Sequence, residues 1–344
     1  MSILLTGTGR TNLPNRVSND ELAARIDTND NWIRSHTGIG SRYIADDNIS
    51  CSDLALEAAK KALAISAGYS GECPAELERA ASEAAAEIDI IILATATPDF
   101  IGCPSTACIV QDKLGAVKAC AMDISAGCTG FVYGLETAAG LLSINSERKR
   151  ALVIGSELLS RNMNWDDRST CVLFGDGAGA VILEKTETPS RTGLVRSFLG
   201  ADGSGKDNLF FNRGGSKNPF KPGETINKPI HVEMKGQEVY YFAVKAMCEV
   251  IEKLFLQEGI NINDVRWIIP HQANTRIIQT VGKTLKLPKE KIYLNIEEYA
   301  NTSAASIPIA LDELNRNGQL NKGDLIMTVG FGGGFTYGGN IIIW

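Results

Sequence analysis

Residues 89–128 read DIIILATATPDFIGCPSTACIVQDKLGAVKACAMDISAGC, and the architecture of the chain can be inferred from this stretch. The apolar run that begins at Asp89 predicts a buried strand, residues 105–114 predict a helix, and CAMDISAG predicts a second strand. A similar series begins at Asp264 with VRWIIPHQAN, continues with a helix through Leu285 and ends with the predicted strand IYLNIEEYANTSAAS. Strands that alternate with helices of this length indicate βαβ units and mainly parallel sheets.

The two series form a weak internal repeat. Cys128 lies 39 residues after Asp89, and Asn301 lies 37 residues after Asp264. Each series is followed by a glycine turn and a β-branched strand, FGDGAGAVILEK in the first half and FGGGFTYGGNIIIW at the end of the chain. The sequence therefore predicts an α/β fold of two similar halves packed face to face.

The polar stretch EKTETPSRTG, residues 184–193, is the natural boundary between these halves. We therefore expect one half to span residues 1–186 and to carry Cys128. The other half is expected to span residues 187–344 and to carry a histidine and an asparagine of the site.

Composition restricts the class of protein. Among 344 residues, 44% are hydrophobic and 22% are charged, which is typical of a globular protein with a large core. The net charge of −6 argues against general nucleic-acid binding, and no apolar run reaches the roughly 18 residues of a membrane span. The eight cysteines show no CxxC spacing, so we expect reduced thiols in a cytoplasmic protein with neither a metal site nor disulfides.

Cys128 is the strongest candidate nucleophile. It follows the predicted strand AMDIS and precedes TGFVYGLETAAGLL, whose apolar spacing predicts a buried helix. A thiol at a helix N-terminus lies in a positive field that favours thiolate, and a thiolate can carry an acyl group as a thioester. A buried structural cysteine is the alternative, but the small neighbours Ala126, Gly127 and Gly130 favour the reactive role.

Two further residues are candidates at the corresponding places of the second half. His271 ends the predicted strand VRWIIP, where it can donate a hydrogen bond to an oxyanion or move a proton, or can be a core histidine. Asn301 can supply an amide donor to the same oxygen, or can cap a turn. The glycine run 332–334 can offer backbone N–H donors or form a simple turn.

These residues lie in motifs that resemble one known family from end to end. The motifs are NDNWIRSHTGIGSRYI, DISAGCTGF, DDRSTCVLFGDGAGA, PHQANTRII, NTSAASIP and FGGGFTYG, which occur in this order. The chain resembles the β-ketoacyl-acyl carrier protein synthase III family of the thiolase-like superfamily. The resemblance implies a thiolase-like fold, in which the two α/β halves form an α-β-α-β-α sandwich.

The resemblance also implies an activity. The catalytic triad would be Cys128, His271 and Asn301, with an oxyanion hole formed by the backbone of Cys128 and Gly333. The enzyme would transfer an acyl group from acyl-CoA to Cys128, and would then condense it with malonyl-acyl carrier protein with loss of carbon dioxide, which initiates fatty acid biosynthesis. Both compounds are substrates, so no cofactor is implied. A homodimer is implied by the family, and neither nucleic acid nor a membrane is an expected partner.

Further positions are assigned by the same resemblance. Residues that match positions of a CoA tunnel are Thr28, Trp32, Arg168, Gly236 and Asn274. Trp32 and Arg168 match the pair that sandwiches the adenine, which suits an aromatic ring and a planar guanidinium. Arg276 and Lys283 lie seven residues apart on one predicted helix face, where they would dock the acidic carrier protein or would form a solvated face.

Three residues depart from the family pattern. His36 stands where many relatives have an arginine that contacts the CoA phosphates. Cys103 stands where straight-chain enzymes commonly have a phenylalanine that closes the acyl pocket across the dimer, so a longer or branched primer is expected to fit. Ala300 replaces the glycine usual before the Asn-Thr-Ser motif. In addition, the segment at residues 67–88 is longer than expected and predicts an extra exposed helix.

Other functions remain open at this point. A degradative thiolase would have a second reactive cysteine near its C-terminal end, but no cysteine follows Cys248. Elongating condensing enzymes use two histidines, whereas Asn301 occupies the second position here. A specialised acyltransferase or condensing enzyme of secondary metabolism would keep the same triad. A noncatalytic module that binds CoA or a carrier protein is the alternative from another class, and the intact triad argues against it.

Overall fold

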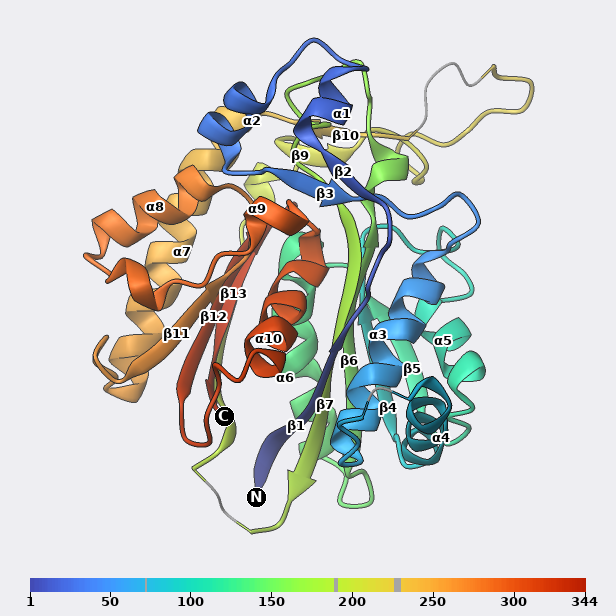
Figure 1. Cartoon of the computed structure of the whole chain (residues 1–344), viewed down its shortest axis with the longest axis vertical. Helices are drawn as coiled ribbons and strands as arrows, with labels where there is room; N and C mark the ends of the chain where they lie inside the picture. The colour runs from blue at the N-terminus through green and yellow to red at the C-terminus, as the bar shows by residue number, and fades with distance from the viewer. Residues whose placement is uncertain (72, 189–190, 226–229) are drawn as a thin grey trace.

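The computed structural model describes residues 1–71, 73–188, 191–225 and 230–344, and its core consists of two mixed β-sheets (Figure 1). The first sheet has the order β1-β7-β6-β4-β5, and the second has the order β11-β12-β13-β8. The bounds in the first sheet are β1 Ser2–Arg10, β4 Ile90–Ala94, β5 Cys120–Ile124, β6 Arg150–Leu158 and β7 Asp176–Thr186. Those in the second are β8 Gly193–Ala201, β11 Val265–Pro270, β12 Leu325–Gly332 and β13 Thr336–Ile343.

Helices separate and cover the two sheets, and the predicted α-β-α-β-α layering is confirmed (Figure 1). The outer face of the first sheet packs against α3, α4 and α5, and that of the second sheet packs against α7 and α8. Between the sheets lie α6 and α10, whose apolar side chains contact both. The bounds are α3 Cys51–Ser66, α4 Pro74–Ala85, α5 Thr106–Leu114, α6 Gly130–Ser143, α7 Gly236–Glu258, α8 Thr275–Thr284 and α10 Ser306–Arg316.

The prediction of mainly parallel sheets is wrong. In the first sheet β4 is parallel to β5 and to β6, but β7 runs antiparallel to both β6 and β1. In the second sheet only β11 and β12 are parallel. In the second half the glycine turn after β12 reverses the chain into β13, whereas in the first half the longer connection over residues 159–175 reverses it between β6 and β7.

The second strand predicted in the C-terminal half does not form. Residues 292–306 contain two isolated bridges, at Ile292 and Asn301, a single helical turn over Ile296–Tyr299 and a 3-10 turn over Ser303–Ala305. Glu297 and Glu298 are adjacent, so an extended chain here would present a charge on each face of a sheet, and this disfavours the strand.

Smaller elements lie over the carboxyl ends of the central strands, at the top of Figure 1. They are β2 Arg16–Ser18, α1 Asn19–Ala23, α2 Asp30–Thr37, β3 Ser41–Tyr43, β9 Leu209–Phe211, β10 Val232–Met234 and α9 Ile296–Tyr299, together with the 3-10 turns η1 Gly127–Thr129, η2 Leu159–Asn162, η3 Gly203–Gly205 and η5 Ser303–Ala305. The turn η4 Lys289–Lys291 lies instead beside the start of β11, where Lys291 Nζ donates to the carbonyl of Val265. The fully buried Arg42 ties this region together, because it donates hydrogen bonds to Asn19 and to the carbonyl of Val172. Val172 belongs to the wall of the cavity described below.

Three features bear on the remaining fold expectations. The predicted halves meet between β7 and β8, which belong to different sheets, although the boundary at residue 186 stays a prediction. The segment after α3 forms α4, and this helix buries Ala81, Ala84 and Ala85 against its neighbours, so it is only partly exposed. Within the part of the chain that the structure describes, no helix has the length and apolarity needed to cross a bilayer.

Candidate active site

A cavity of about 260 Å³ opens between the two halves and brings the three candidate catalytic residues together. Cys128 comes from η1 at the carboxyl end of β5, His271 follows β11, and Asn301 precedes η5. The other side chains of the wall are mainly apolar or aromatic, among them Trp32, Val172, Leu173, Phe174, Leu209, Met234, Val239, Tyr240, Ile277 and Phe331. An apolar cavity with a few convergent polar groups is the usual form of a ligand site.

Glycines allow the turn that carries Cys128 to lie against the C-terminal strands. Gly127 has a φ of +54°, which an L side chain rarely adopts, and a Cβ on it would lie 2.9 Å from the backbone nitrogen of Gly333. A Cβ on Gly332 would lie 2.5 Å from the backbone nitrogen of Cys128. Thr336 Oγ1 donates to the carbonyl of Ala126 at 2.7 Å and joins the turn to β13. The backbones of Cys128 and Gly333 are therefore neighbours, as a shared oxyanion site requires.

Gly332→Ala is expected to displace this turn. The added methyl group would overlap backbone atoms, which cannot rotate away, and overpacking of this kind costs about 1–3 kcal/mol of unfolding free energy. Chemical denaturation and the rate of Cys128 alkylation are the measurements. The matched control is Gly140→Ala in α6, where a Cβ meets nothing within 4 Å and alanine is expected to stabilise the helix. Equal stability of the two variants would contradict the argument.

The pKa of Cys128 differs in direction from the sequence expectation. Burial is the largest cause of a pKa raised to about 12 for this thiol; the Ser303 side chain opposes the shift in pKa, and the nearby Glu157 carboxylate adds to it. The helix N-terminus predicted a lowered pKa, but the desolvation of a charged sulfur outweighs that effect in this largely apolar cavity. Desolvation therefore favours the neutral thiol of Cys128 over its thiolate.

His271 is buried as a neutral imidazole. Desolvation lowers its pKa to about 3, and within the described chain neither ring nitrogen has a hydrogen-bond partner. Its backbone nitrogen donates to the carbonyl of Val329 at 2.8 Å, and the ring meets the edge of Phe331. Unpaired buried nitrogens cost stability, so their position in the cavity wall indicates a partner that arrives with substrate. The unfolded chain binds a proton on this histidine below about pH 6.5 and the folded chain does not until about pH 3, so acid in this window favours unfolding.

Asn301 is fixed by its backbone and by its own side chain. Its N–H donates to the carbonyl of Leu173 at 2.9 Å, and its carbonyl accepts from Gly175 at 3.0 Å, which joins the two halves. The side-chain Oδ1 accepts from the backbone nitrogen of Ser303 at 2.8 Å, so the Nδ2 group is left as the donor. Ala300 has a φ of +56°, a conformation that favours glycine, so this departure from the family pattern introduces local backbone strain.

Three of the five residues expected to bind CoA line the cavity. Trp32, Gly236 and Asn274 line it, whereas Thr28 and Arg168 do not. The guanidinium carbon of Arg168 lies 5.1 Å from the Trp32 ring centroid, and His36 stacks against Trp32 at 4.5 Å. The His36 ring therefore packs on the tryptophan.

The remaining expected residues lie outside the cavity wall. Arg276 is exposed, and its Nε donates to the carbonyl of Ser35 at 3.0 Å. Lys283 lines a separate groove of about 410 Å³ with Lys286, Lys289 and the apolar residues Ile278, Leu287, Ile292 and Leu294. Cys103 is exposed in the loop before α5.

Sequence reasoning missed two residues beside the nucleophile. Glu157 is fully buried near Cys128, and Ser303 interacts through its side chain with both. Glu157 had a signal in the sequence, because it is the one charge in the apolar run ALVIGSELL. Ser303 lies within the quoted motif NTSAASIP, but nothing in the motif distinguished it from its neighbours.

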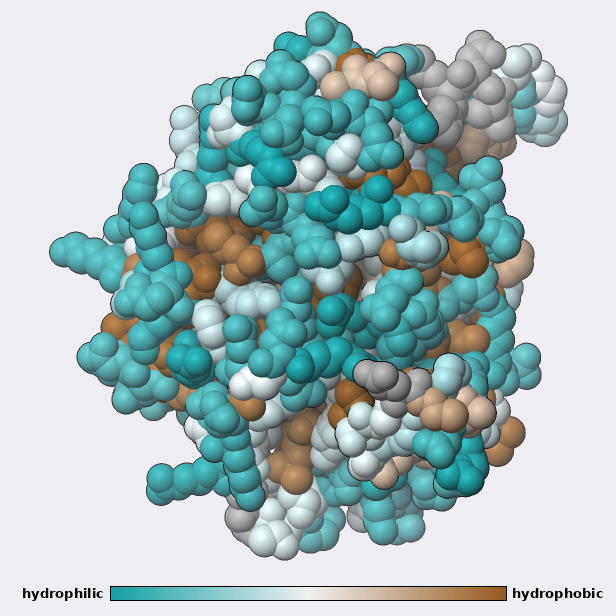
Figure 2. Space-filling model, in the orientation of Figure 1, coloured by the Kyte–Doolittle hydropathy of each residue, from teal (hydrophilic) through white to brown (hydrophobic). Residues whose placement is uncertain are grey.

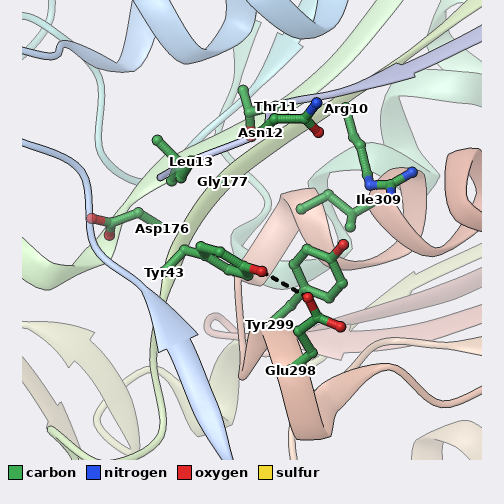
Figure 3. Close-up of a pocket in the computed structure, with 10 residues that line it drawn as sticks. All are labelled: Arg10, Thr11, Asn12, Leu13, Tyr43, Asp176, Gly177, Glu298, Tyr299 and Ile309. Atoms are coloured by element: carbon green, nitrogen blue, oxygen red, sulfur yellow. Dashed lines mark hydrogen bonds between the residues drawn. The ribbon is translucent and has the colours of Figure 1, made fainter. Parts of the chain in front are cut away.

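A second cavity of about 260 Å³ lies between β1, β3, β7 and α9, and contains none of the expected residues (Figure 3). Tyr43 donates to Glu298 at 2.7 Å across its floor. Asp176 at its edge accepts from Ser160 and from the backbone of Ala45, so its carboxylate is already paired. These internal pairings leave the first cavity as the candidate active site.

Two layered α/β halves, with a cysteine at the start of one central helix and a histidine and an asparagine from the other half, define a thiolase-like condensing enzyme. Comparison with known proteins narrows this class. Residues 122–203 match the family model described as 3-oxoacyl-[acyl-carrier-protein (ACP)] synthase III, and residues 255–344 match the model of its C-terminal part. The chain belongs to the β-ketoacyl-[acyl-carrier-protein] synthase III family.

Individual relatives cover the whole chain. The β-ketoacyl-[acyl-carrier-protein] synthase III of Caldanaerobacter subterraneus subsp. tengcongensis is 46% identical over 99% of this chain and 97% of its own length. The crystal structure of 3-oxoacyl-[acyl-carrier-protein] synthase III from Aquifex aeolicus VF5 has 39% identity and a TM-score of 0.86, and covers 99% of this chain and all of that one. The priming β-ketosynthase of the R1128 polyketide biosynthetic pathway has 29% identity and a TM-score of 0.87, covering 99% of this chain and 96% of that one.

Proposed function

We propose that the chain catalyses the decarboxylating condensation of an acyl-CoA primer with malonyl-acyl carrier protein, which initiates fatty acid biosynthesis. The observation that carries the proposal is the convergence of Cys128, His271 and Asn301 on one largely apolar cavity. A thiol can hold an acyl group, and two neutral donors can stabilise a developing enolate without protonating it. Membership of the family gives the reaction class, and the cavity supports these residues as its site.

The first half-reaction uses Cys128. Its sulfur attacks the thioester carbonyl of acyl-CoA, and the backbone N–H groups of Cys128 and Gly333 stabilise the oxyanion. CoA leaves and the acyl group stays on sulfur. These groups all belong to the chain, so the proposal invokes no cofactor.

The second half-reaction uses His271 and Asn301. Malonyl-acyl carrier protein loses carbon dioxide, and negative charge develops on the thioester oxygen. A neutral His271 ring nitrogen and Asn301 Nδ2 donate hydrogen bonds to that oxygen. Because the pKa of His271 is lowered, the ring stays neutral at physiological pH and acts as a hydrogen-bond donor. The carbanion then attacks the acyl-cysteine.

The CoA and primer sites are assigned around the same cavity. Trp32 and Arg168 would hold the adenine, and since Arg168 lies directly over Trp32, the guanidinium must move to admit it. Thr28, Gly236 and Asn274 would bind the rest of CoA. The Asn274 Nδ2 group donates to the carbonyl of His36, which links this position to the stacked His36 ring.

The carrier protein would dock beside α8. Arg276 and Lys283 are exposed there, and Lys286 and Lys289 line the groove that continues from Lys283. Figure 2 shows apolar surface beside α8 with hydrophilic side chains around it. On a chain of net charge −6, this cluster of cations is the surface suited to an acidic partner.

A homodimer would form through β5, the edge strand of the first sheet. Its outward side chains are incompletely covered, and Met122 and nearby Val117 are exposed. An unprotected edge strand readily pairs with another copy. Cys103 is exposed in the adjacent loop, where a dimer would carry it to the partner's acyl pocket.

Mass spectrometry of the intact protein after incubation with a panel of acyl-CoAs tests the proposal. We expect one acyl group on Cys128, and the added mass identifies the primer. A longer or branched group would agree with the small side chain of Cys103, and a product that does not enter fatty acids would favour a role like that of the polyketide priming enzyme. Failure of every acyl-CoA to label the protein would instead support a noncatalytic binding module.

A further inference from the structure

A buried carboxylate lies beneath the nucleophile at the end of β6. Glu157 has no exposed surface, and its oxygens accept from the backbone nitrogen of Ala96 at 3.0 Å and from Thr97 Oγ1 at 2.8 Å. Thr95 Oγ1 adds a longer contact of 3.3 Å. All of these donors are neutral, so this carboxylate is buried without the charge of a partner to offset desolvation. A group that is so costly to bury requires an explanation that packing does not supply.

Ser303 joins this carboxylate to the nucleophile across the boundary between the halves. Its side chain interacts with Glu157 and with Cys128, and it is 4% exposed. The turn that carries it packs tightly on β6, where a Cβ on Gly155 would collide with the carbonyl of Ala304. Ser303 itself has a φ of +49°, a strained conformation for a residue other than glycine. A hydroxyl can accept a hydrogen bond from a thiol while donating one to a carboxylate.

The other titratable groups in this region are poor acceptors for the thiol proton. Cys51 of α3 faces Glu157, and burial together with the Glu157 charge raises the pKa of Cys51. His271 shares the cavity with Cys128, but its pKa of about 3 makes it a weak base at physiological pH. Burial raises the pKa of Glu157, so this carboxylate is the group best suited to accept a proton.

We propose that Glu157 is a positioning residue that holds the Cys128 proton, through Ser303, while the acyl group is on sulfur. The inference rests on the proposed function and adds a route for the proton. As sulfur attacks the acyl-CoA carbonyl, the S–H bond breaks and its proton passes to Ser303 Oγ, while the Ser303 proton passes to Glu157. CoA leaves as a thiolate and takes a proton from water.

The condensation reverses this transfer. The carbanion left by decarboxylation displaces the Cys128 sulfur, and the proton returns from Glu157 through Ser303 to that sulfur. The free enzyme therefore holds one negative charge on this pair of residues, and the acyl-enzyme holds none. Loss of that charge favours the approach of the anionic malonyl group only after Cys128 is loaded.

Glu157→Gln tests the proposal, because the amide keeps the shape of the side chain and cannot take the proton. The rate at which acyl-CoA labels Cys128 should fall at least about 10²-fold near pH 7, and the deficit should narrow as pH rises and water accepts the proton. Alkylation of Cys128 by iodoacetamide should not be slowed in the same way. Its pH profile should move to lower pH in Glu157→Gln, because a negative charge near the sulfur is removed. Ser303→Ala should also slow acylation of Cys128, by a factor that becomes smaller as pH rises. A variant with both Glu157→Gln and Ser303→Ala should acylate no more slowly than the slower of the two single variants.

Asp176→Asn is the matched control, since it removes another buried carboxylate from the same half without a link to Cys128. It should leave the shape of the acylation pH profile unchanged. The infrared difference spectrum of acylated minus free wild-type enzyme should show a newly protonated carboxyl group, which keeps the proposal testable if Glu157→Gln does not fold. A deficit in the acylation rate that does not depend on pH would refute the role of Glu157 but not the proposed function. Acylation of wild type without the carboxyl band would do the same. A wild-type protein that no acyl-CoA labels would refute the proposed function as well.

Discussion

Cys128→Ala is expected to abolish both the acyl adduct and the overall condensation. The variant lacks the only thiol among the described residues that line the cavity, and loss of a nucleophile that acts in concert with its partners lowers turnover by at least about 10⁴-fold. Intact-protein mass spectrometry and release of carbon dioxide from malonyl-acyl carrier protein measure the two half-reactions. The fold should survive, because Cys128 is partly exposed and alanine is smaller.

The matched control is Cys108→Ala, which removes an exposed thiol of α5 that does not line the cavity. It should leave the adduct mass and its stoichiometry unchanged. Retention of a stable acyl adduct by Cys128→Ala would show that another residue carries the acyl group, and the assignment of the nucleophile would then be wrong.

His271→Ala is expected to separate the half-reactions. Removal of one donor to a developing oxyanion costs about 2.7–4 kcal/mol of activation free energy, or about 10²–10³ in rate. Decarboxylation of malonyl-acyl carrier protein should show this loss, whereas acylation of Cys128 should change much less because the backbone supplies its oxyanion donors. The two rates should be measured separately on the same preparation.

The unfolding free energy of His271→Ala should also be compared with that of wild type at each pH. The difference should favour the variant more between about pH 3 and pH 6.5 than at pH 8. Burial lowers the pKa of His271 to about 3, so wild type loses stability as acid protonates the unfolded chain, and alanine has nothing to protonate. Equal losses in both half-reactions would contradict the division of roles. Asn301→Ala should resemble His271→Ala in decarboxylation but should show no such change in pH dependence.

The layered fold could be predicted because its strongest signals are local. Buried strands such as β4 and helices such as α6 are continuous apolar segments, and their order along the chain limits the possible topologies. Whether neighbouring strands run parallel or antiparallel was harder to predict from the sequence. The pairing of β1 with β7 joins residues far apart in the sequence, and no local pattern reports it.

The site also combines features that local sequence signals predict with features that depend on tertiary packing. Cys128, His271 and Asn301 were expected to meet, and the cavity brings them together, although the strand predicted at Asn301 does not form. The direction of the Cys128 pKa shift was predicted wrongly, since desolvation and the nearby Glu157 depend on tertiary packing. The contribution of Ser303 was hidden for the same reason, because its partners come from the other half.

The close contact of Gly332 and Gly333 with the Cys128 turn has a consequence for the order of folding. Gly332 ends β12, Gly333 lies just before β13, and β13 inserts between β12 and β8. A chain that has folded only its first sheet therefore lacks the backbone against which Cys128 is aligned. The nucleophile is aligned only once the second sheet has formed, so neither sheet can assemble the site by itself.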